Sequence, residues 1–311
     1  MPEKLILDVD TGIDDAIGIL LAVKSKNFDL LGITTVSGNV SLNTATINTC
    51  KILDLLGSTE IPVVKGAESP LFRKPVFEHR IHGEDGLGGA LKDIPVSNEI
   101  SDGFAPDFII NSILSFSGEV TLICTGPLTN LALAVKKCPQ ITKHVKKVIF
   151  MGGVVRGVGN ITPTAEFNAY VDPEAAKIVL QAGFPSIVQV GLDVTRKALL
   201  TRDHIQQLKD EKLASYLDES TSDYQQKYYS RYNVHACAMH DPLAVGIAIN
   251  SKLVVTEKHY VDVETKSELC DGQFVCDFQN RLNKEPNLEV CLEVDTEAFF
   301  EMFIETLNSK N

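Results

Sequence analysis

LILDVDTGIDDA, residues 5–16, is the stretch that decides the fold of this 311-residue chain. Its apolar start, Leu5–Leu7, predicts a buried strand, and the apolar residues from Ile13 onward recur at helical spacing. Gly12 allows the backbone to turn tightly between the two. The carboxylates of the stretch are Asp8, Asp10, Asp14 and Asp15. They lie where a strand gives way to a helix, at the edge of an open α/β sheet where ligands bind.

Carboxylates held a few ångströms apart repel one another by energies on the kcal/mol scale, unless water screens them or a cation compensates their charge. A bound metal ion explains this group most simply. The alternative is a solvated acidic turn, in which Asp14 or Asp15 interacts with the positive end of the helix. Because all these acids follow one buried strand, the metal site is the favoured interpretation.

The charge of the chain argues against some partners. Lys and Arg number 29 against 41 Asp and Glu, and a net charge of −12 disfavours binding to nucleic acid. The N-terminus shows no signal-peptide pattern, and no apolar run approaches the about 18 residues of a membrane span. We therefore expect a soluble, cytoplasmic protein without a nucleic-acid or membrane partner. Its even composition predicts a single domain over residues 1–311.

Apolar runs alternate with helical patterns along most of the chain. The expected strands after the first are 29–36, 62–64, 120–124, 147–151 and 187–190. The expected helices are 42–56, 104–116, one that begins near Pro127 as its first helical residue, 172–182, most of 203–232 and one near 296–307. Later runs around 254–255, 261–263, 274–276 and 290–292 indicate peripheral strands. This order predicts an α/β fold with an open, mainly parallel sheet flanked by helices, with extra peripheral strands.

Polar residues follow several of these strands. Asn39 comes after the second strand, where it is equally typical of a turn beside glycine. Thr125 follows strand 120–124, and its carbonyl is a hard oxygen ligand. The irregular loop after strand 147–151 carries Asn160, Glu166 and Asn168, which offer the hydrogen bonds that a polyhydroxyl ligand needs. Taken alone, the polarity of that loop is also explained by contact with solvent.

Histidines and a row of tyrosines are further candidates. His82 lies beside the glycine-rich loop 83–89, which can approach a ligand closely or simply connect two elements. The row consists of Tyr224, Tyr228 and Tyr232. Four-residue spacing puts them on one helical face, which is typical of packing but here has strongly polar neighbours. His240 precedes Asp241, which can be interpreted as a helix N-cap with Pro242 at the first helical position, although that interpretation does not account for the neighbouring His240.

Five separated motifs resemble the inosine-uridine-preferring family of nucleoside hydrolases. They are DVDTGIDDA at 8–16, His82-Gly83, TGPLTN at 125–130, Glu166-Phe167-Asn168 and His240-Asp241-Pro242. The likeness runs in the expected order from residue 5 to about residue 250. It implies hydrolysis of the N-glycosidic bond of ribonucleosides to ribose and free base, with a calcium ion at the base of the pocket. It also implies a homodimer or a homotetramer.

The resemblance further implies the site residues. The metal ligands would be Asp10, Asp15, Asp241 and the Thr125 carbonyl. With two ribose hydroxyls and a water they bring the shell to about eight oxygens, which suits calcium better than magnesium. The substrate-holding residues on the ribose side would be Asp14, Asn39, Asn160, Glu166 and Asn168, with Phe167 from the same motif.

The chemistry implied by the family follows from charge. Loss of the base turns the ribose into an oxocarbenium-like cation, which the carboxylates around the ion would stabilise. Asp10 would take the proton from the metal-held water. On the other side of the bond, His240 is the candidate acid for the departing base, and His82 is a second candidate for contact with the base.

Base preference depends on the register of the tyrosine row. Counted back from His240 without gaps, Tyr224 and Tyr228 fall where broad-specificity members of the family carry tyrosines. Pyrimidine-specific members carry Thr and Gln there, and Thr221 and Gln225 stand at the same spacing, so a three-residue shift would reverse the prediction. The gap-free register predicts broad or inosine-uridine-preferring hydrolysis, and pyrimidine-specific hydrolysis is the alternative.

Other functions fit parts of the sequence. DVDTG at 8–12 resembles the DxDxT nucleophile of haloacid-dehalogenase-like phosphotransferases, which would use Asp8 but leave the loop 160–168 and His240 without a role. A nucleoside phosphorylase would need a cluster of basic residues for phosphate, and residues 150–170 offer none. A ribose- or nucleoside-binding module would gain nothing from a base such as Asp10 beside a metal-held water.

Overall fold

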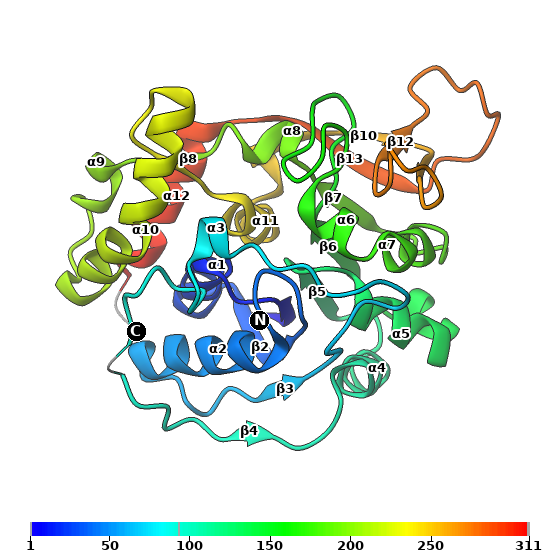
Figure 1. Cartoon of the computed structure of the whole chain (residues 1–311). Helices are drawn as coiled ribbons and strands as arrows, with labels where there is room; N and C mark the ends of the chain where they lie inside the picture. The colour runs from blue at the N-terminus through cyan, green and yellow to red at the C-terminus, as the bar shows by residue number, and fades with distance from the viewer. Residues whose placement is uncertain (1, 93, 310–311) are drawn as a thin grey trace.

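The computed structural model describes residues 2–92 and 94–309, and its centre is a nine-stranded sheet (Figure 1). The strand order is β10-β13-β7-β6-β5-β1-β2-β3-β4. These strands are β1 (Glu3–Val9), β2 (Phe28–Thr35), β3 (Val63–Lys65), β4 (Ile100–Ser101), β5 (Val120–Cys124), β6 (Lys147–Met151), β7 (Ile187–Val190), β10 (Val254–His259) and β13 (Leu288–Val294). Neighbours pair in parallel, except that β10 is antiparallel to β13. The predicted open, mainly parallel sheet is confirmed.

Two hydrophobic cores cover the two faces of the sheet. The helices are α1 (Ile13–Lys24), α2 (Leu42–Leu56), α3 (His79–His82), α4 (Ala105–Ser115), α5 (Thr129–Lys137), α6 (Phe167–Val171), α7 (Pro173–Leu180), α8 (Leu192–Thr195), α9 (Arg202–Ile205), α10 (Glu211–Tyr232), α11 (His240–Ile249) and α12 (Thr296–Leu307). Leu5 and Leu7 of β1 belong to the core with α1, α10, α11 and α12, whereas Ile6 belongs to the core with α4, α5 and α7. This alternation is the period of a strand with both faces buried.

The later strands divide into two groups. β10 and β13 extend the main sheet at one edge, so they are part of it rather than separate additions. β11 (Val261–Val263) and β12 (Phe274–Cys276) pair only with each other, and β8 (Leu199–Leu200) pairs with β9 (Cys237–Ala238). None of the helices in the described part of the chain is both long enough and apolar enough to span a bilayer.

The order of the strands reverses beside β1. From β1 the chain proceeds through β2, β3 and β4 on one side, and then returns to build β5, β6 and β7 on the other. The carboxyl ends of β1 and β5 therefore form a topological switch point, where open α/β sheets bind their ligands. Asp10 follows β1 and Thr125 follows β5, so the fold brings both residues to this point.

Two predicted helix starts are wrong. Helix α11 begins at His240 with Met239 as its N-cap, because the Met239 N–H still bonds to the Ala198 carbonyl (2.8 Å) and the chain turns helical directly afterwards. Asp241 is therefore not a cap, and its carboxylate is free to point elsewhere. Helix α5 begins at Thr129 rather than at Pro127, because the Thr125 N–H continues the ladder to the Asp8 carbonyl (2.8 Å).

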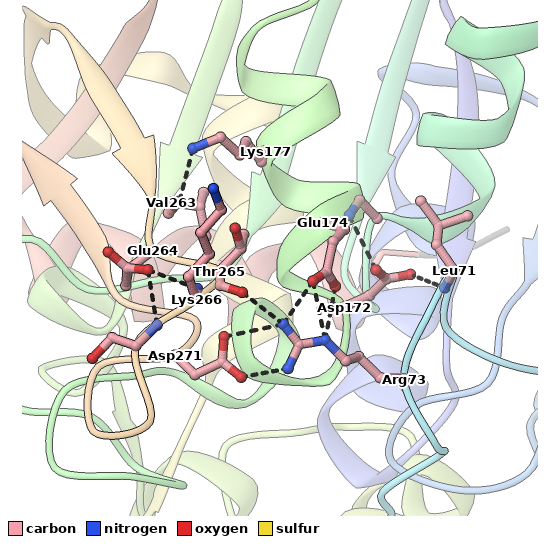
Figure 2. A network of polar contacts seen from close by, with 12 residues as sticks. Leu71, Arg73, Asp172, Glu174, Lys177, Val263, Glu264, Thr265, Lys266 and Asp271 are labelled. Carbon is pink, nitrogen blue, oxygen red and sulfur yellow. Dashed lines mark hydrogen bonds and ion pairs between the residues drawn. The ribbon is translucent and has the colours of Figure 1, made fainter.

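Arg73 holds the long connection between β3 and α3 in place (Figure 2). Its guanidinium donates to both carboxylate oxygens of Glu174 in α7 (2.6 and 2.9 Å), to the Thr265 carbonyl (3.2 Å) and to Asp271. The Arg73 side chain is only 31% exposed, so water screens these ion pairs incompletely. Three segments far apart in the sequence are thus fixed to one another, and one of them leads to His82.

We predict that Arg73→Ala lowers the free energy of unfolding by about 2 kcal/mol, because it leaves two partly buried carboxylates without their shared partner. Urea denaturation followed by circular dichroism measures the change. The matched control is Arg202→Ala, whose partner Asp218 and own side chain are 47% and 71% exposed. That variant should unfold at the same urea concentration as the wild type. Equal losses in both variants would contradict the structural role given to Arg73.

Candidate active site

A pocket of about 600 Å³ opens above the carboxyl ends of the central strands. Its lining includes most of the residues that the sequence predicted for the site: Asp14, Asn39, His82, Thr125, Asn160, Glu166, Phe167, Asn168, Tyr224, Tyr228, His240 and Asp241. Asp10 and Asp15 lie directly behind this surface, with 0% and 1% of their surface exposed. Residues from both ends of the chain therefore converge on one cavity.

Carboxylates crowd the floor of this pocket. Asp14, Asp15 and Asp241 each offer an oxygen, and these oxygens lie within 4.8 Å of one another. Asp10 adjoins the group, since its backbone N–H donates to Asp15 Oδ1 (3.3 Å). The sequence resemblance grouped Asp10 with Asp15 and Asp241 and gave Asp14 to the sugar, whereas the tightest cluster in the structure contains Asp14.

The cluster is electrostatically suited to a cation. Burial and the neighbouring carboxylates raise the pKa of Asp14 to about 8, and they raise the pKa values of Asp10 and Asp241 well above the usual range. Asp10 Oδ1 and Asp14 Oδ1 are buried and have no hydrogen-bond partner among the described residues. Carboxylate oxygens without donors, in a group that cannot ionise together at low cost, are ligands that fit a hard divalent cation.

Backbone and side-chain donors fix the orientation of these acids. The Asn39 N–H donates to Asp10 Oδ2 (2.6 Å), and the Asn39 side chain donates to Asp15 Oδ2 (3.1 Å). The Thr125 hydroxyl donates to Asp15 Oδ1 (2.7 Å), and the Thr125 carbonyl accepts from Asn168 Nδ2 (2.6 Å). A Cβ on Gly38 would lie only 2.0 Å from Asp10 Oδ2. The chain therefore needs glycine at 38 to let Asp10 take this position.

Asp8 is separated from the other acids of its stretch. Asp8 lies two residues after Ile6 in β1, so its side chain faces the same side of the sheet, the side covered by α5. There Asp8 Oδ1 accepts from Asn130 Nδ2 (2.8 Å) and from the Thr34 hydroxyl (2.6 Å). Burial raises the pKa of Asp8 to about 7. Asp8 is fully buried and does not line the pocket, which counts against its use as a phosphotransfer nucleophile.

The loop between β6 and α6 forms one wall. Glu166 caps α6: its carboxylate accepts from the N–H groups of Asn168 (2.9 Å) and Ala169 (3.1 Å) and from Gly153 (2.8 Å). Asn160 Oδ1 accepts from the Phe167 N–H (2.9 Å), which orients the Asn160 amide. This wall thus presents fixed polar groups, as the sequence predicted for a polyhydroxyl ligand.

The two histidines are held by their Nδ1 atoms. His82 Nδ1 accepts from the Ile13 N–H (3.0 Å), so the neutral ring carries its proton on Nε2. The ring fits only because residue 12 is glycine, since a Cβ there would lie 2.5 Å from it. His240 Nδ1 lies 2.7 Å from the Thr195 hydroxyl. Burial lowers the pKa of His82 to about 4 and that of His240 to about 3, so both rings are neutral in the free protein.

The tyrosine row lines the wall opposite the loop. The ring centroids of Tyr224 and Tyr228 are 6.4 Å apart, and those of Tyr228 and Tyr232 are 4.6 Å apart. All three tyrosines border the pocket. Thr221 and Gln225 do not: the Thr221 hydroxyl donates to the Leu217 carbonyl (2.6 Å), and Gln225 Nε2 donates to that hydroxyl (2.9 Å). The geometry therefore agrees with the gap-free register.

Some pocket residues were not predicted. Arg196, Lys227 and Arg231 line the cavity, and Thr195 contacts His240 from behind it. The sequence did offer a signal for the turn after β7. Asp193, Thr195 and Arg196 follow that strand just as Asp10 follows β1. The cationic residues of α10 gave no such signal, since charges on an amphipathic helix usually face solvent.

Fold and site together define a class of protein: an α/β enzyme whose pocket, at a topological switch point, combines a buried acidic floor with polar and aromatic walls. A sequence model of the inosine-uridine preferring nucleoside hydrolases matches residues 5–301. The chain belongs to this family, and it is a ribonucleoside hydrolase, which is a kind of N-glycosidase. The family and the fold expected from the sequence motifs are both confirmed.

Relatives of known structure or function cover nearly the whole chain. The inosine-uridine preferring nucleoside hydrolase of Crithidia fasciculata is 38% identical over 99% of this chain and 98% of its own. The pyrimidine-specific ribonucleoside hydrolase RihB of Escherichia coli is 36% identical over 96% of this chain and 94% of its own. A plant nucleoside hydrolase structure superimposes with a TM-score of 0.93 at 33% identity and covers 100% of both chains.

We predict that Gly38→Ala lowers kcat/KM by about 100-fold or more, because the added Cβ displaces Asp10 from the Asn39 N–H. Release of reducing sugar from a ribonucleoside measures it. Gly18→Ala is the control, since a Cβ at this helical glycine finds only ordinary contacts of 3.6 Å or longer. The control should keep full activity and gain up to about 1 kcal/mol of stability. An active Gly38→Ala enzyme would show that the position of Asp10 is unimportant.

Proposed function

We propose that this ribonucleoside hydrolase cleaves purine and pyrimidine ribonucleosides alike, with a calcium ion at the acidic floor of its pocket. The observation that carries the proposal is the convergence of Asp14, Asp15 and Asp241 within 4.8 Å, beside Asp10 and below a cavity of about 600 Å³. One wall of the cavity offers amide groups and Glu166, and the other offers tyrosines and histidines. A sugar fits the first wall, and a planar base fits the second.

The ion would be held by Asp10, Asp15, Asp241 and the Thr125 carbonyl. These are all hard oxygen donors, and calcium accepts about six to eight of them, whereas magnesium demands a stricter octahedron. When bound, calcium supplies a water of lowered pKa and a fixed point for sugar hydroxyls. Asp14 shares the cluster, and its unpartnered Oδ1 is the carboxylate oxygen that we assign to a ribose hydroxyl.

Asp10 is the proposed general base. Its Oδ2 is fixed by the Asn39 N–H, while its Oδ1 has no partner among the described residues and is available to accept a proton from the attacking water. Asn39, Asn160, Glu166 and Asn168 would hold the sugar, with Phe167 beside them. The carboxylates then stabilise the positive charge that develops on the ribose ring as the bond to the base breaks.

The histidines would serve the leaving base. His240 has Nδ1 occupied by Thr195, so Nε2 is the nitrogen available to a ligand in the pocket. We assign it the donation to the departing base, with His82 as a second contact through its Nε2–H. Both rings border the same cavity as the tyrosines.

Broad base preference rests on the tyrosine row. Tyr224 and Tyr228 border the pocket, whereas Thr221 and Gln225 bond within α10. Flat aromatic surfaces accept both purines and pyrimidines, because stacking does not read the edge of a base. Pyrimidine-specific hydrolysis stays as the second candidate, supported by the 36% identity to the pyrimidine-specific enzyme of Escherichia coli.

We further propose that the chain is a single domain, acts in the cytoplasm and assembles into a homodimer or homotetramer. The match of one family model to residues 5–301 supports the single domain. A sedimentation experiment on the purified enzyme measures its assembly directly.

Incubation of the purified protein with inosine and with uridine in phosphate-free buffer tests the function. We expect ribose and free base from both nucleosides, with loss of activity in a calcium chelator and recovery on adding calcium. Strict dependence on phosphate would indicate a phosphorylase. Cleavage of uridine alone would favour the pyrimidine-specific candidate, and activity that survives chelation would contradict the role of the metal.

Asp10→Ala should lower turnover by about 1,000-fold because it removes the general base. Nucleoside binding should change by no more than about tenfold, or about 1.4 kcal/mol, because other groups hold the sugar. Titration calorimetry in the presence of calcium measures binding.

The matched control for Asp10→Ala is Asp8→Asn, because the Asp8 carboxylate accepts from Asn130 and Thr34 and is not part of the carboxylate cluster, so this variant should keep most of the activity. A phosphotransferase that used Asp8 would give the reverse order, with Asp8→Asn inactive and Asp10→Ala less affected.

A further inference from the structure

The turn after β7 carries three polar side chains that serve different parts of the pocket. It consists of α8 (Leu192–Thr195) and the following Arg196. Thr195 is fully buried, and Asp193 and Arg196 are partly exposed. The proposed mechanism gives none of the three a role, yet each makes a defined contact with an element that does have one.

On the sugar side, this turn holds the loop between β6 and α6. The carboxylate of Asp193 accepts from the N–H groups of Val155 (2.9 Å) and Arg156 (2.8 Å). The guanidinium of Arg196 donates to the carbonyls of Val158 and Gly159, both at 2.7 Å. The loop is therefore fixed at its start and again immediately before Asn160, the first of the residues assigned to the ribose.

On the base side, Thr195 holds His240. Its hydroxyl lies 2.7 Å from His240 Nδ1, which leaves Nε2 for a ligand in the pocket. A hydroxyl can both donate and accept, so it satisfies Nδ1 whether or not that nitrogen carries a proton. The contact therefore fixes the orientation of the His240 ring toward the pocket.

We propose that this one turn positions the groups on both sides of the bond to be broken. Thr195 is a positioning residue for His240 on the base side, and Asp193, with Arg196, is a positioning residue for the loop that carries Asn160 on the sugar side. The inference rests on the proposed function. A merely structural role would instead make both variants lose stability, would make Thr195→Val lower kcat equally on every substrate, and would make Asp193→Ala lower kcat rather than raise KM.

The first test compares two substrates in Thr195→Val, which has the shape of threonine without its hydroxyl. Inosine needs help for its leaving base, whereas p-nitrophenyl β-D-ribofuranoside releases a phenolate that is stable without a proton. We expect kcat on inosine to fall about 30-fold with KM within about threefold, as for loss of a supporting hydrogen bond to a site residue. On the nitrophenyl riboside, kcat should stay within about threefold of the wild type.

Two further variants make the first test decisive. Thr195→Ser keeps the hydroxyl and should recover inosine hydrolysis to within about threefold. Thr142→Val is the matched control, because Thr142 is also buried but its hydroxyl donates to the Pro139 carbonyl (3.0 Å), outside the set of pocket residues. Equal losses on both substrates in Thr195→Val, no loss on either, or no recovery by serine would overturn the role of Thr195.

The second test addresses the sugar side with Asp193→Ala. Freeing the start of the loop should raise KM about tenfold for inosine and for the nitrophenyl riboside alike, since both carry the same ribose. Asp277→Ala is the matched control, because Asp277 also accepts from two backbone N–H groups, those of Arg281 (2.8 Å) and Leu282 (2.6 Å), yet it does not line the pocket. A change confined to inosine would overturn the role of Asp193.

The outcomes separate this inference from the function on which it rests. A wild-type enzyme that releases ribose from neither inosine nor uridine overturns both. An active wild type whose Thr195→Val variant shows no split between the two substrates, or whose Asp193→Ala variant leaves KM unchanged for both, overturns the positioning role alone. Thermal unfolding of every variant reports whether a loss of activity reflects a loss of folded protein.

Discussion

Repulsion among buried carboxylates is the constraint on which the rest of this structure depends. Asp10, Asp14, Asp15 and Asp241 share a space where water screens little, so burial and the neighbouring charges raise the pKa values of Asp10, Asp14 and Asp241. Hydrogen bonds from the surrounding backbone partly offset this repulsion. The Asn39 N–H donates to Asp10, and the Gly12 N–H donates to Asp15 (3.0 Å). The repulsion that these donors do not offset favours the binding of a cation. A bound cation can in turn bind the hydroxyls of a sugar.

The topology explains how acids so distant in sequence come together. β1 and β5 meet at the switch point, and α1 starts at Ile13 directly above them. Helix α11 packs against α1, which brings Asp241 beside Asp14 and Asp15. Gly18 of α1 lies at this contact, where even an added Cβ would stay at an ordinary van der Waals distance of 3.6 Å from the Asp241 backbone. The site is therefore a product of helix packing as much as of strand ends.

Sequence patterns predicted the strands well, because the apolar run of a strand buried on both faces has few other structural interpretations. The helix over residues 42–56 and the strands 120–124, 147–151 and 187–190 agree with the structure at both ends. The start of α11 was wrong, because Asp-Pro is a common helix opening and the bond from Met239 to Ala198 joins residues 41 positions apart. For the same reason the turn of Asp193 and Thr195 was overlooked: its partners lie in distant loops, which local periodicity does not report.

The walls of the pocket differ in how they are built. The wall that carries Asn160 and Glu166 is assembled from the ends of several strands and from loops that bond to one another, so a change in one residue disturbs many. The wall that carries the tyrosines depends largely on one helix, α10, which contributes Tyr224, Tyr228 and Tyr232. Substitutions within that helix can therefore reshape one wall of the pocket while the acidic floor stays unchanged. The relatives described above share a hydrolytic reaction and differ in the nucleosides for which they are named.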